Sequence, residues 1–422
     1  MTGVSITGIG LVTPVGRGPD AVFDAMLTGR SGITRPAEDH PVLGSLEVAG
    51  FAEAIDPKSL FSGPEVRTID RVTLLAVLTA GDALADAGIE VGRDVDPYRI
   101  AVIGAGVGGM ATLEHQVTQR VARGRAAVSP YLLPGILPNM AAARIAIRYG
   151  IRGYSSTIAT ACAAGAQAIA EGMRLIRSGD ADVVVCGCSE APLFPTFAET
   201  FDNARALARG WEDPAQASRP FDSRRNGFVL SEGAGYLVLE RTGHADARGV
   251  AGYADVAGWG GTTDAHHPTT PRPDGASAAE CVRRALASAG IAPGDVGYLN
   301  AHGTSTKLGD VAETIATHEV FGHSGPPVSS TKSVTGHLLG ASGVVEAAAC
   351  ALAIGRETLP PTHNLDDPDP ACELDHVRKG PRQVRIDYAL SNSFGFGGQN
   401  ISLLLGRAGT RNTRSHERSA TV

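Results

Sequence analysis

This chain has few lysines, no long apolar run and fewer positive than negative charges. Lysine occurs only as Lys58, Lys307, Lys332 and Lys379, and the net charge of −7 argues against nucleic-acid binding as the main task. No stretch approaches the ~20 uninterrupted apolar residues of a membrane span, so we expect no membrane segment. The first fourteen residues lack a basic start and are interrupted by glycine and proline. They predict a strand and turn rather than a signal peptide.

Paired cysteines are also missing. The six cysteines form no CxxC pair and no zinc-like spacing, and no histidine motif of the HExxH type is present, so we expect no metal site. Reduced thiols fit a cytoplasmic protein.

The remaining composition is that of an ordinary globular protein: 422 residues, 43% hydrophobic and 19% charged. Apolar strand-like runs alternate with segments of helical periodicity, which predicts α/β layers with strands covered on both faces. Strands are expected near 99–104, 182–186, 235–240, 296–301, 328–330 and 401–405. Helices are expected near 72–87, 163–178, 276–290, 309–321 and 341–355.

A weak internal repeat indicates that the chain has two similar halves, 1–250 and 251–408. In the first half a small-residue strand leads into Cys162 and a helix, and in the second Ala389-Leu-Ser-Asn-Ser-Phe394 leads into a glycine turn. The polar segment 409–422 predicts a disordered tail.

Cys162 is the candidate nucleophile. Apolar residues recur at helical spacing from Ala163 to Ile176, which places Cys162 at a helix N-terminus after a strand. Unpaired N–H groups and the helix dipole favour a thiolate at such a position. Taken alone, Cys162 fits a buried core cysteine equally well.

Two histidine motifs follow, Asn300-Ala-His302-Gly-Thr-Ser-Thr306 and Lys332-Ser-Val-Thr-Gly-His337. Either histidine alone is more often a structural imidazole than a site residue. Lys332 and Glu346 stand in small, apolar surroundings, where a buried charge needs a partner. Together with the glycine-rich Asn392-Ser-Phe394-Gly-Phe396-Gly-Gly398, these parts suit thioester chemistry in which charge develops on a carbonyl oxygen. His266 and His267 are expected only to shape a loop.

With these motifs in place, the chain resembles the elongating class of β-ketoacyl-acyl carrier protein synthases, including ketosynthases of type II polyketide synthases. The resemblance runs from Val4 to Leu405 and includes two further long matches, Ser218–Gly235 and Val328–Gly343. It implies a thiolase-like fold: two similar α/β halves in five α-β-α-β-α layers.

The resemblance also assigns roles. It implies that Cys162 accepts the acyl group, that His302 and His337 stabilise the enolate formed on decarboxylation, and that Lys332 and Glu346 form a supporting ion pair. Other roles implied are an oxyanion hole from the N–H groups of Cys162 and Phe396, a gate at Phe396, pantetheine binding by Thr304 and Thr306, and an acyl tunnel at Val107, Leu132 and Phe201, with Leu132 reaching across a dimer.

The implied reaction is decarboxylative Claisen condensation with malonyl-acyl carrier protein, which extends a fatty-acid or polyketide chain by two carbons. No intrinsic cofactor is expected, because the substrates ride on the phosphopantetheine of acyl carrier protein. The expected partners are acyl carrier protein and a second subunit, in a homodimer or in a heterodimer with a chain-length-factor-like paralogue.

Two rival interpretations remain. A non-condensing partner subunit would bind carrier protein and shape chain length, but such subunits replace the nucleophile. A thiolase or cysteine hydrolase acting on coenzyme A esters would lack the two-histidine arrangement.

Overall fold

The computed structural model describes residues 2–409, whose eleven-stranded main sheet divides into two five-stranded mixed sheets with the same internal order, joined edge to edge. The eleventh strand is the short Gly16–Arg17, which pairs with the end of the first strand of the chain. The first sheet runs β6 (Ser155–Ile158), β5 (Ile100–Ala105), β7 (Val183–Glu190), β8 (Gly233–Arg241) and β1 (Val4–Thr13). The second runs β11 (Val328–Ser329), β10 (Tyr298–Asn300), β14 (Tyr388–Gly395), β15 (Gln399–Gly406) and β9 (Ala254–Thr263).

Both sheets place their strands in the order third, second, fourth, fifth and first along the chain. In each, the fifth strand, β8 or β15, is antiparallel to both neighbours. The sheets meet where β1 pairs with β9 through Ser5 with Asp255 and Ile6 with Ala254. The shared order identifies the fold as a duplication.

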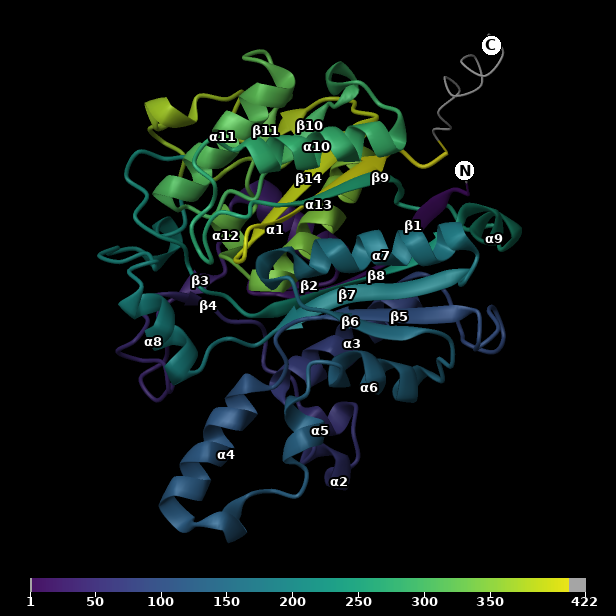
Figure 1. The fold of residues 1–422 in the computed structure, drawn as a ribbon, viewed down its shortest axis with the longest axis vertical. Coiled ribbons are helices and arrows are strands. Elements are labelled where there is room, and N and C mark those ends of the chain that lie inside the picture. The colour runs from purple at the N-terminus through teal and green to yellow at the C-terminus, as the bar shows by residue number, and fades with distance from the viewer. Residues whose placement is uncertain (1, 410–422) are drawn as a thin grey trace.

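Helices complete five layers. Helices α7 (Ala164–Ser178) and α13 (Ser342–Arg356) pack on each other between the sheets. Helices α3 (Arg71–Asp86) and α6 (Met140–Tyr149) cover the outer face of the first sheet, and α10 (Ala276–Ala289) and α11 (Lys307–Phe321) that of the second (Figure 1). This α-β-α-β-α arrangement confirms the thiolase-like fold.

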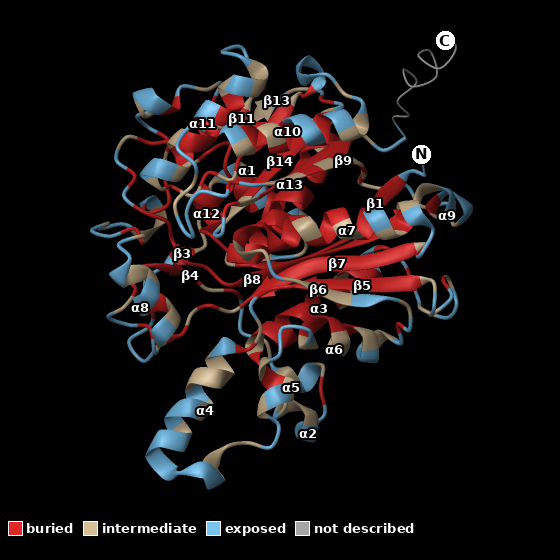
Figure 2. Ribbon diagram, viewed as in Figure 1, coloured by how far each residue is buried: buried red, intermediate tan, exposed pale blue. Residues whose placement is uncertain are grey.

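The central layers are apolar because both faces of each sheet are covered. Every residue of β7 is buried, and in α13 every residue from Ser342 to Ile354 is buried (Figure 2). Within residues 2–409, the segment Leu339–Arg356 is the one helix apolar and long enough to pass for a membrane span, and 89% of it is buried inside the protein. Its apolarity is that of a core helix.

The structure corrects which segments of the internal repeat correspond to each other. The segment Ala389–Phe394 lies in β14, which corresponds to β7, so it is not the counterpart of the turn at Cys162. That counterpart is the short 3-10 helix η6 (Leu339–Ala341), which precedes α13 as η3 (Ala161–Ala163) precedes α7. Strand order, which the sequence does not display, decides the equivalence.

The two turns match in backbone detail. Ala161 and Leu339 each take the left-handed conformation, with φ of 47° and 49°. Gly165 and Gly343 lie at equivalent places where α7 and α13 touch: a Cβ on Gly165 would be 2.4 Å from the carbonyl oxygen of Gly340, and one on Gly343 would be 2.9 Å from the nitrogen of Ala166. Glycine is therefore required at both positions for the helices to approach.

One region projects from the layered body. Helices α4 (Met110–Arg123) and α5 (Leu132–Ile136) form an outlying arm, and α4 buries none of its residues (Figures 1 and 2). The other helices are α1 (Pro19–Thr28), α2 (Gly63–Val66), α8 (Pro195–Asn203), α9 (Thr242–Ala247) and α12 (Lys332–Thr335). Short strands are β2 (Gly16–Arg17), β3 (Ile33–Thr34), β4 (Ala49–Gly50), β12 (Thr358–Leu359) and β13 (Arg382–Gln383).

The expected tail, 409–422, lies outside the described residues apart from Gly409.

Candidate active site

Cys162 lies in the middle of η3, immediately before the central helix α7. The preceding Ala161 holds a positive φ of 47°, a strained conformation for a residue with a Cβ. The expected position at a helix N-terminus after a strand is thus observed, with one tight turn in between. Strain of this kind concentrates at sites where a side chain must be aimed.

The charge state of Cys162 differs from the expected thiolate. Burial raises the pKa of the Cys162 thiol to about 12, although Lys332 and the backbone N–H groups of Phe396 and Cys162 lower it. Only 8% of the residue is exposed. Desolvation therefore outweighs the helix terminus, and the resting group is a neutral thiol that must lose its proton as it reacts.

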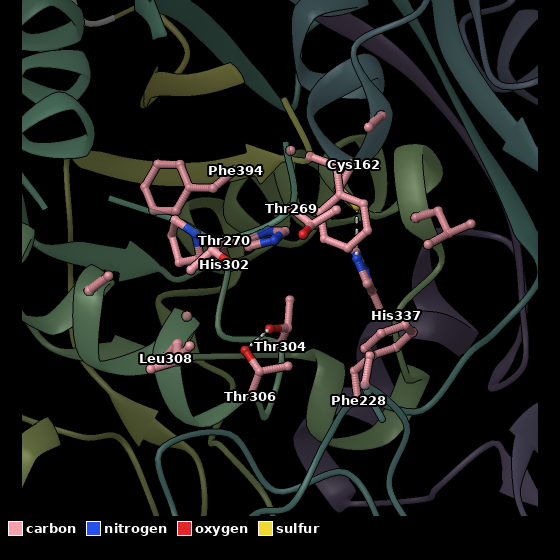
Figure 3. A pocket seen from close by; sticks show the side chains of 18 of the residues that line it. Cys162, Phe228, Thr269, Thr270, His302, Thr304, Thr306, Leu308, His337 and Phe394 are labelled. Carbon is pink, nitrogen blue, oxygen red and sulfur yellow. Dashed lines mark hydrogen bonds between the residues drawn. The ribbon is translucent and has the colours of Figure 1, made fainter. Parts of the chain in front are cut away.

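His337 is the nearest base. Its Nε2 lies 3.2 Å from the Sγ of Cys162, and its Nδ1 lies 3.2 Å from the hydroxyl of Ser342. Figure 3 shows the Cys162–His337 contact at one side of the cavity. Burial, followed by the charge of Lys332, holds the pKa of His337 well below its usual range, so the ring is neutral.

His302 points into the same cavity as His337, from a different part of its wall (Figure 3). Its ring stands edge-on to that of His337 with 5.5 Å between centroids, and both rings point into the cavity (Figure 3). Burial, Lys332 and then His337 hold the pKa of His302 well below its usual range. Among residues 2–409 its buried Nδ1 has no hydrogen-bond partner.

Lys332 and Glu346 form a buried ion pair behind the histidines, each residue being 1% exposed. The Nζ of Lys332 also donates to the carbonyl oxygen of His302, 2.6 Å away. Burial raises the pKa of Glu346 to about 7, opposed by the positive charge of Lys332. The ammonium is thereby fixed against the backbone of His302.

A cavity of about 730 Å³ opens onto Cys162 and the two histidines. Its lining includes Cys162, His302, His337 and Phe396, which is 44% exposed. Thr304 and Thr306 line another part of the cavity with hydroxyl oxygens 3.0 Å apart (Figure 3). The cavity is thus bounded by the nucleophile, both imidazoles and hydroxyl groups suited to a polar arm.

The structure brings two of the three expected tunnel residues to the cavity, but not the third. Val107 and Phe201 line the cavity, and the ring of Phe201 lies 6.2 Å from that of Phe396. Leu132 does not line it; it begins α5 in the projecting arm, partly exposed. Within a single chain Leu132 is therefore apart from the other two.

Several site residues escaped the sequence analysis. Glu313 on α11 accepts the backbone N–H groups of His302 and Gly303, each at 2.8 Å. Glu190 ends β7 and lines the cavity beside Cys162. A carboxyl residue at the end of a buried apolar strand is a usable signal for a site, and Asp182-Val-Val-Val-Cys-Gly-Cys-Ser-Glu190 carries it. Ser342, the partner of His337, carries no such signal.

No group of His, Cys, Asp and Glu able to hold a metal ion occurs within residues 2–409. All six cysteines are free thiols.

Comparison with known proteins identifies the family. The model of the β-ketoacyl synthase N-terminal domain matches residues 1–245, and that of the C-terminal domain matches residues 253–366. The chain belongs to the β-ketoacyl synthase family. Its sequence is 40% identical over 403 residues to 3-oxoacyl-[acyl-carrier-protein] synthase 2 of Synechocystis, covering 95% of this chain and 97% of the relative. The same identity holds to the Staphylococcus aureus synthase 2, over 95% and 97%.

Solved structures agree with this β-ketoacyl synthase over nearly its whole length. The ishigamide ketosynthase/chain length factor matches with a TM-score of 0.90 and 31% identity, covering 97% of this chain and 100% of that one. A type II polyketide synthase acyl-carrier protein in complex with its ketosynthase matches at 0.88 and 31%, covering 96% and 99%. A β-ketoacyl synthase from Burkholderia phymatum matches at 0.89 and 33%, covering 96% and 100%.

Proposed function

We propose that this β-ketoacyl synthase joins an acyl group held on Cys162 to malonyl-acyl carrier protein, extending a fatty-acid or polyketide chain by two carbons with loss of CO2. The observation that carries the proposal is the placement of a neutral cysteine thiol and two neutral imidazoles around one cavity. We also propose that the chain divides as 1–250 and 251–408, the first half holding the nucleophile and the second both histidines.

In acyl loading, the Sγ of Cys162 attacks the thioester carbonyl of the incoming acyl group. Its proton passes to Nε2 of His337, 3.2 Å away, and from there to the departing pantetheine thiolate. The N–H groups of Cys162 and Phe396 lower the pKa of the cysteine thiol. They are therefore suited to stabilise the oxyanion. The products are the acyl-enzyme and free pantetheine thiol, so atoms and charge balance.

In the second half-reaction, the malonyl thioester carbonyl lies between the two imidazoles. Loss of CO2 leaves an electron pair that forms the enolate, and N–H donors on His302 and His337 stabilise its oxygen. The Ser342 hydroxyl can either accept from or donate to Nδ1 of His337. It therefore supports both the tautomer that receives the thiol proton and the one that donates to the enolate.

Condensation follows when the carbanion attacks the acyl carbonyl on Cys162. The tetrahedral oxyanion occupies the site beside the N–H groups of Cys162 and Phe396, and its collapse expels the cysteine sulfur as a thiolate. The thiolate takes up a proton from solvent by way of His337 and returns to the neutral thiol. Burial keeps both histidines neutral, and Lys332 supports the enolate step by adding to that effect and by fixing the carbonyl of His302.

We propose that the pantetheine arm of acyl carrier protein runs past Thr304 and Thr306, with Phe396 as the gate, and that no intrinsic cofactor takes part. The exposed arm suits a second subunit in a homodimer or a chain-length-factor heterodimer: Val117 and Val121 on α4 and Leu133 on α5 are 50%, 78% and 61% exposed. Leu132 would then complete the acyl tunnel across the dimer, beyond Val107 and Phe201. The expected compartment is the cytoplasm.

The alternative, a non-condensing partner subunit, does not need a reactive thiol. Cys162→Ala should cut acyl transfer by ~10³-fold or more, and mass spectrometry should find an acyl adduct on the wild type but not on this variant. Cys281→Ala is the matched control, because Cys281 is a buried thiol on helix α10 that does not line the cavity. An adduct that persists on Cys162→Ala would contradict the assignment.

A further inference from the structure

Glu190 is a buried acid in the cavity wall for which the proposed mechanism has no use. It ends β7, is 1% exposed and lines the cavity together with Cys162 and Val107. Its Oε2 has no hydrogen-bond partner among residues 2–409. A buried polar atom without a partner is costly, so its retention next to the nucleophile calls for a physical role.

The carboxyl of Glu190 lies between two tight turns. A Cβ on Gly340 would be 2.9 Å from Oε1 of Glu190, and a Cβ on Gly106 would be 3.7 Å from the same oxygen. The N–H groups of Val107 and Gly340 act on the carboxyl and lower its pKa. Glu190 thus spans the turn that carries the tunnel residue Val107 and the turn η6, which is the structural counterpart of the nucleophile turn.

The surroundings of Glu190 favour its uncharged form. Burial raises the pKa of Glu190 to about 8, and it outweighs the N–H groups of Val107 and Gly340, which lower that pKa. The titratable groups that face Glu190 are the thiol of Cys188, 3.9 Å away, the thiol of Cys162 and the phenol of Tyr236. No Lys, Arg or His of residues 2–409 forms an ion pair with it. When ionised, Glu190 raises the pKa of Cys162 and so opposes the attack.

We propose that Glu190 is a positioning residue: it joins the Gly106–Val107 turn to Gly340, holds the acyl-side wall against Cys162 and thereby controls acyl loading rather than loss of CO2. The proposal rests on the proposed function, since it assigns Glu190 to one of the two half-reactions.

The histidine side of the cavity is held independently. Glu313 accepts the N–H groups of His302 and Gly303. The backbone of His337 bonds to Val229 through its N–H and to Ser231 through its carbonyl. Loss of the Glu190 carboxyl therefore leaves the groups that stabilise the enolate in place.

The test separates the half-reactions in the full-length protein. Acyl loading is followed by mass spectrometry with acyl-carrier-protein thioesters, and decarboxylation by CO2 release from malonyl-acyl carrier protein. Glu190→Leu removes the carboxyl that packs against both turns, so loading should fall at least about tenfold while CO2 release changes less than about threefold. Glu190→Gln keeps an acceptor of the same shape and should load normally near pH 7.

Glu240→Leu is the matched control. Glu240 is buried in β8 and pairs with Val183 at the opposite end of β7, where it binds Thr7, His244 and Arg248 away from the cavity. Its loss should lower the melting temperature without changing the ratio of loading to CO2 release.

The pH dependence of acyl loading is a further test, because a purely structural role of Glu190 would not change it. Ionisation of Glu190 as the pH rises through about 8 should depress loading in the wild type, and Glu190→Gln should lack that alkaline loss. Equal losses of loading and CO2 release in Glu190→Leu, or identical pH profiles of Glu190→Gln and the wild type, would overturn the role of Glu190 alone. Failure of the wild type to form any adduct on Cys162 would overturn the proposed function as well.

Discussion

The two halves share one scaffold but hold different chemistry at matching places. The turn before α7 presents Cys162, whereas the equivalent turn before α13 presents Gly340, and the residue ahead of each is left-handed. A side chain at Gly340 would collide with Cys188, Glu190 and the backbone of Ala161. Only one of the two turns therefore has room for a nucleophile, and its counterpart serves as the wall against which the nucleophile packs.

The halves also divide the charge. The first half contributes a neutral thiol, the N–H group of Cys162 and the apolar side chains of Val107 and Phe201 in the cavity wall. The second contributes Lys332, Glu346 and Glu313, all buried and all arranged around His302. In the proposed mechanism, the charge that develops on the enolate is stabilised by groups of the second half, whereas the acyl group lies against apolar side chains of the first.

Breaking the buried ion pair of the second half should have the largest effect on stability and on decarboxylation. Lys332→Met leaves Glu346 buried without its cation, and Glu346→Ala does the reverse. Each should cost about 3–5 kcal/mol of unfolding free energy together with most of the decarboxylation activity. The double variant Lys332→Met/Glu346→Leu should recover stability but not activity. Thermal melting alongside CO2 release checks both; unchanged melting in either single variant would show that the pair is not buried.

The histidines offer the next largest effect and separate the half-reactions. His337 contacts the Cys162 sulfur and His302 does not, although the two motifs look equivalent in the sequence. His302→Ala should therefore reduce CO2 release by about 10²-fold and largely spare acyl loading, whereas His337→Ala should reduce both. Equal effects of the two variants on loading would contradict the role of His337 as the base for Cys162.

Packing between the halves can be altered without touching the chemistry. Gly165→Ala inserts a methyl group 2.4 Å from the carbonyl oxygen of Gly340 and should destabilise the protein by about 1–3 kcal/mol. Gly355→Ala, at the exposed end of α13 with no atom within 4 Å of the new Cβ, should stabilise it by about 0.5–1 kcal/mol. Denaturant unfolding measures the two shifts, and a neutral Gly165→Ala would mean that α7 and α13 can move apart.

The smallest effect is expected from a change in the cavity wall of the first half, where it should alter only the accepted acyl chain length. Val107→Phe adds volume to the cavity lining and should lower the rate with the longest accepted acyl chain about tenfold or more, while rates with short primers change much less. A series of acyl-carrier-protein thioesters of increasing length tests this. A uniform fall at every length would show that Val107 does not limit the chain.

Much of the site was accessible from the sequence because its residues stand in contiguous motifs. Cys162, His302, His337 and Lys332 come from segments far apart in the chain, and the structure brings all four to one cavity wall or directly behind it. Glu190, Glu313 and Ser342 were missed because their roles depend on which backbone groups and side chains face them. The expected thiolate at Cys162 was wrong for the same reason: a helix terminus is visible in a sequence, but desolvation by a folded pocket is not.

The sequence by itself determined the family, the α/β alternation and the candidate reactive groups, because periodicity and contiguous motifs are local properties of a chain. Only the tertiary structure decided which segments are equivalent, since that depends on strand order, and which histidine touches the cysteine. It alone also placed Glu190 between the Gly106–Val107 turn and Gly340 and set the pKa values of the buried groups. Those depend on what surrounds a residue in space, and residues distant in sequence supply those surroundings.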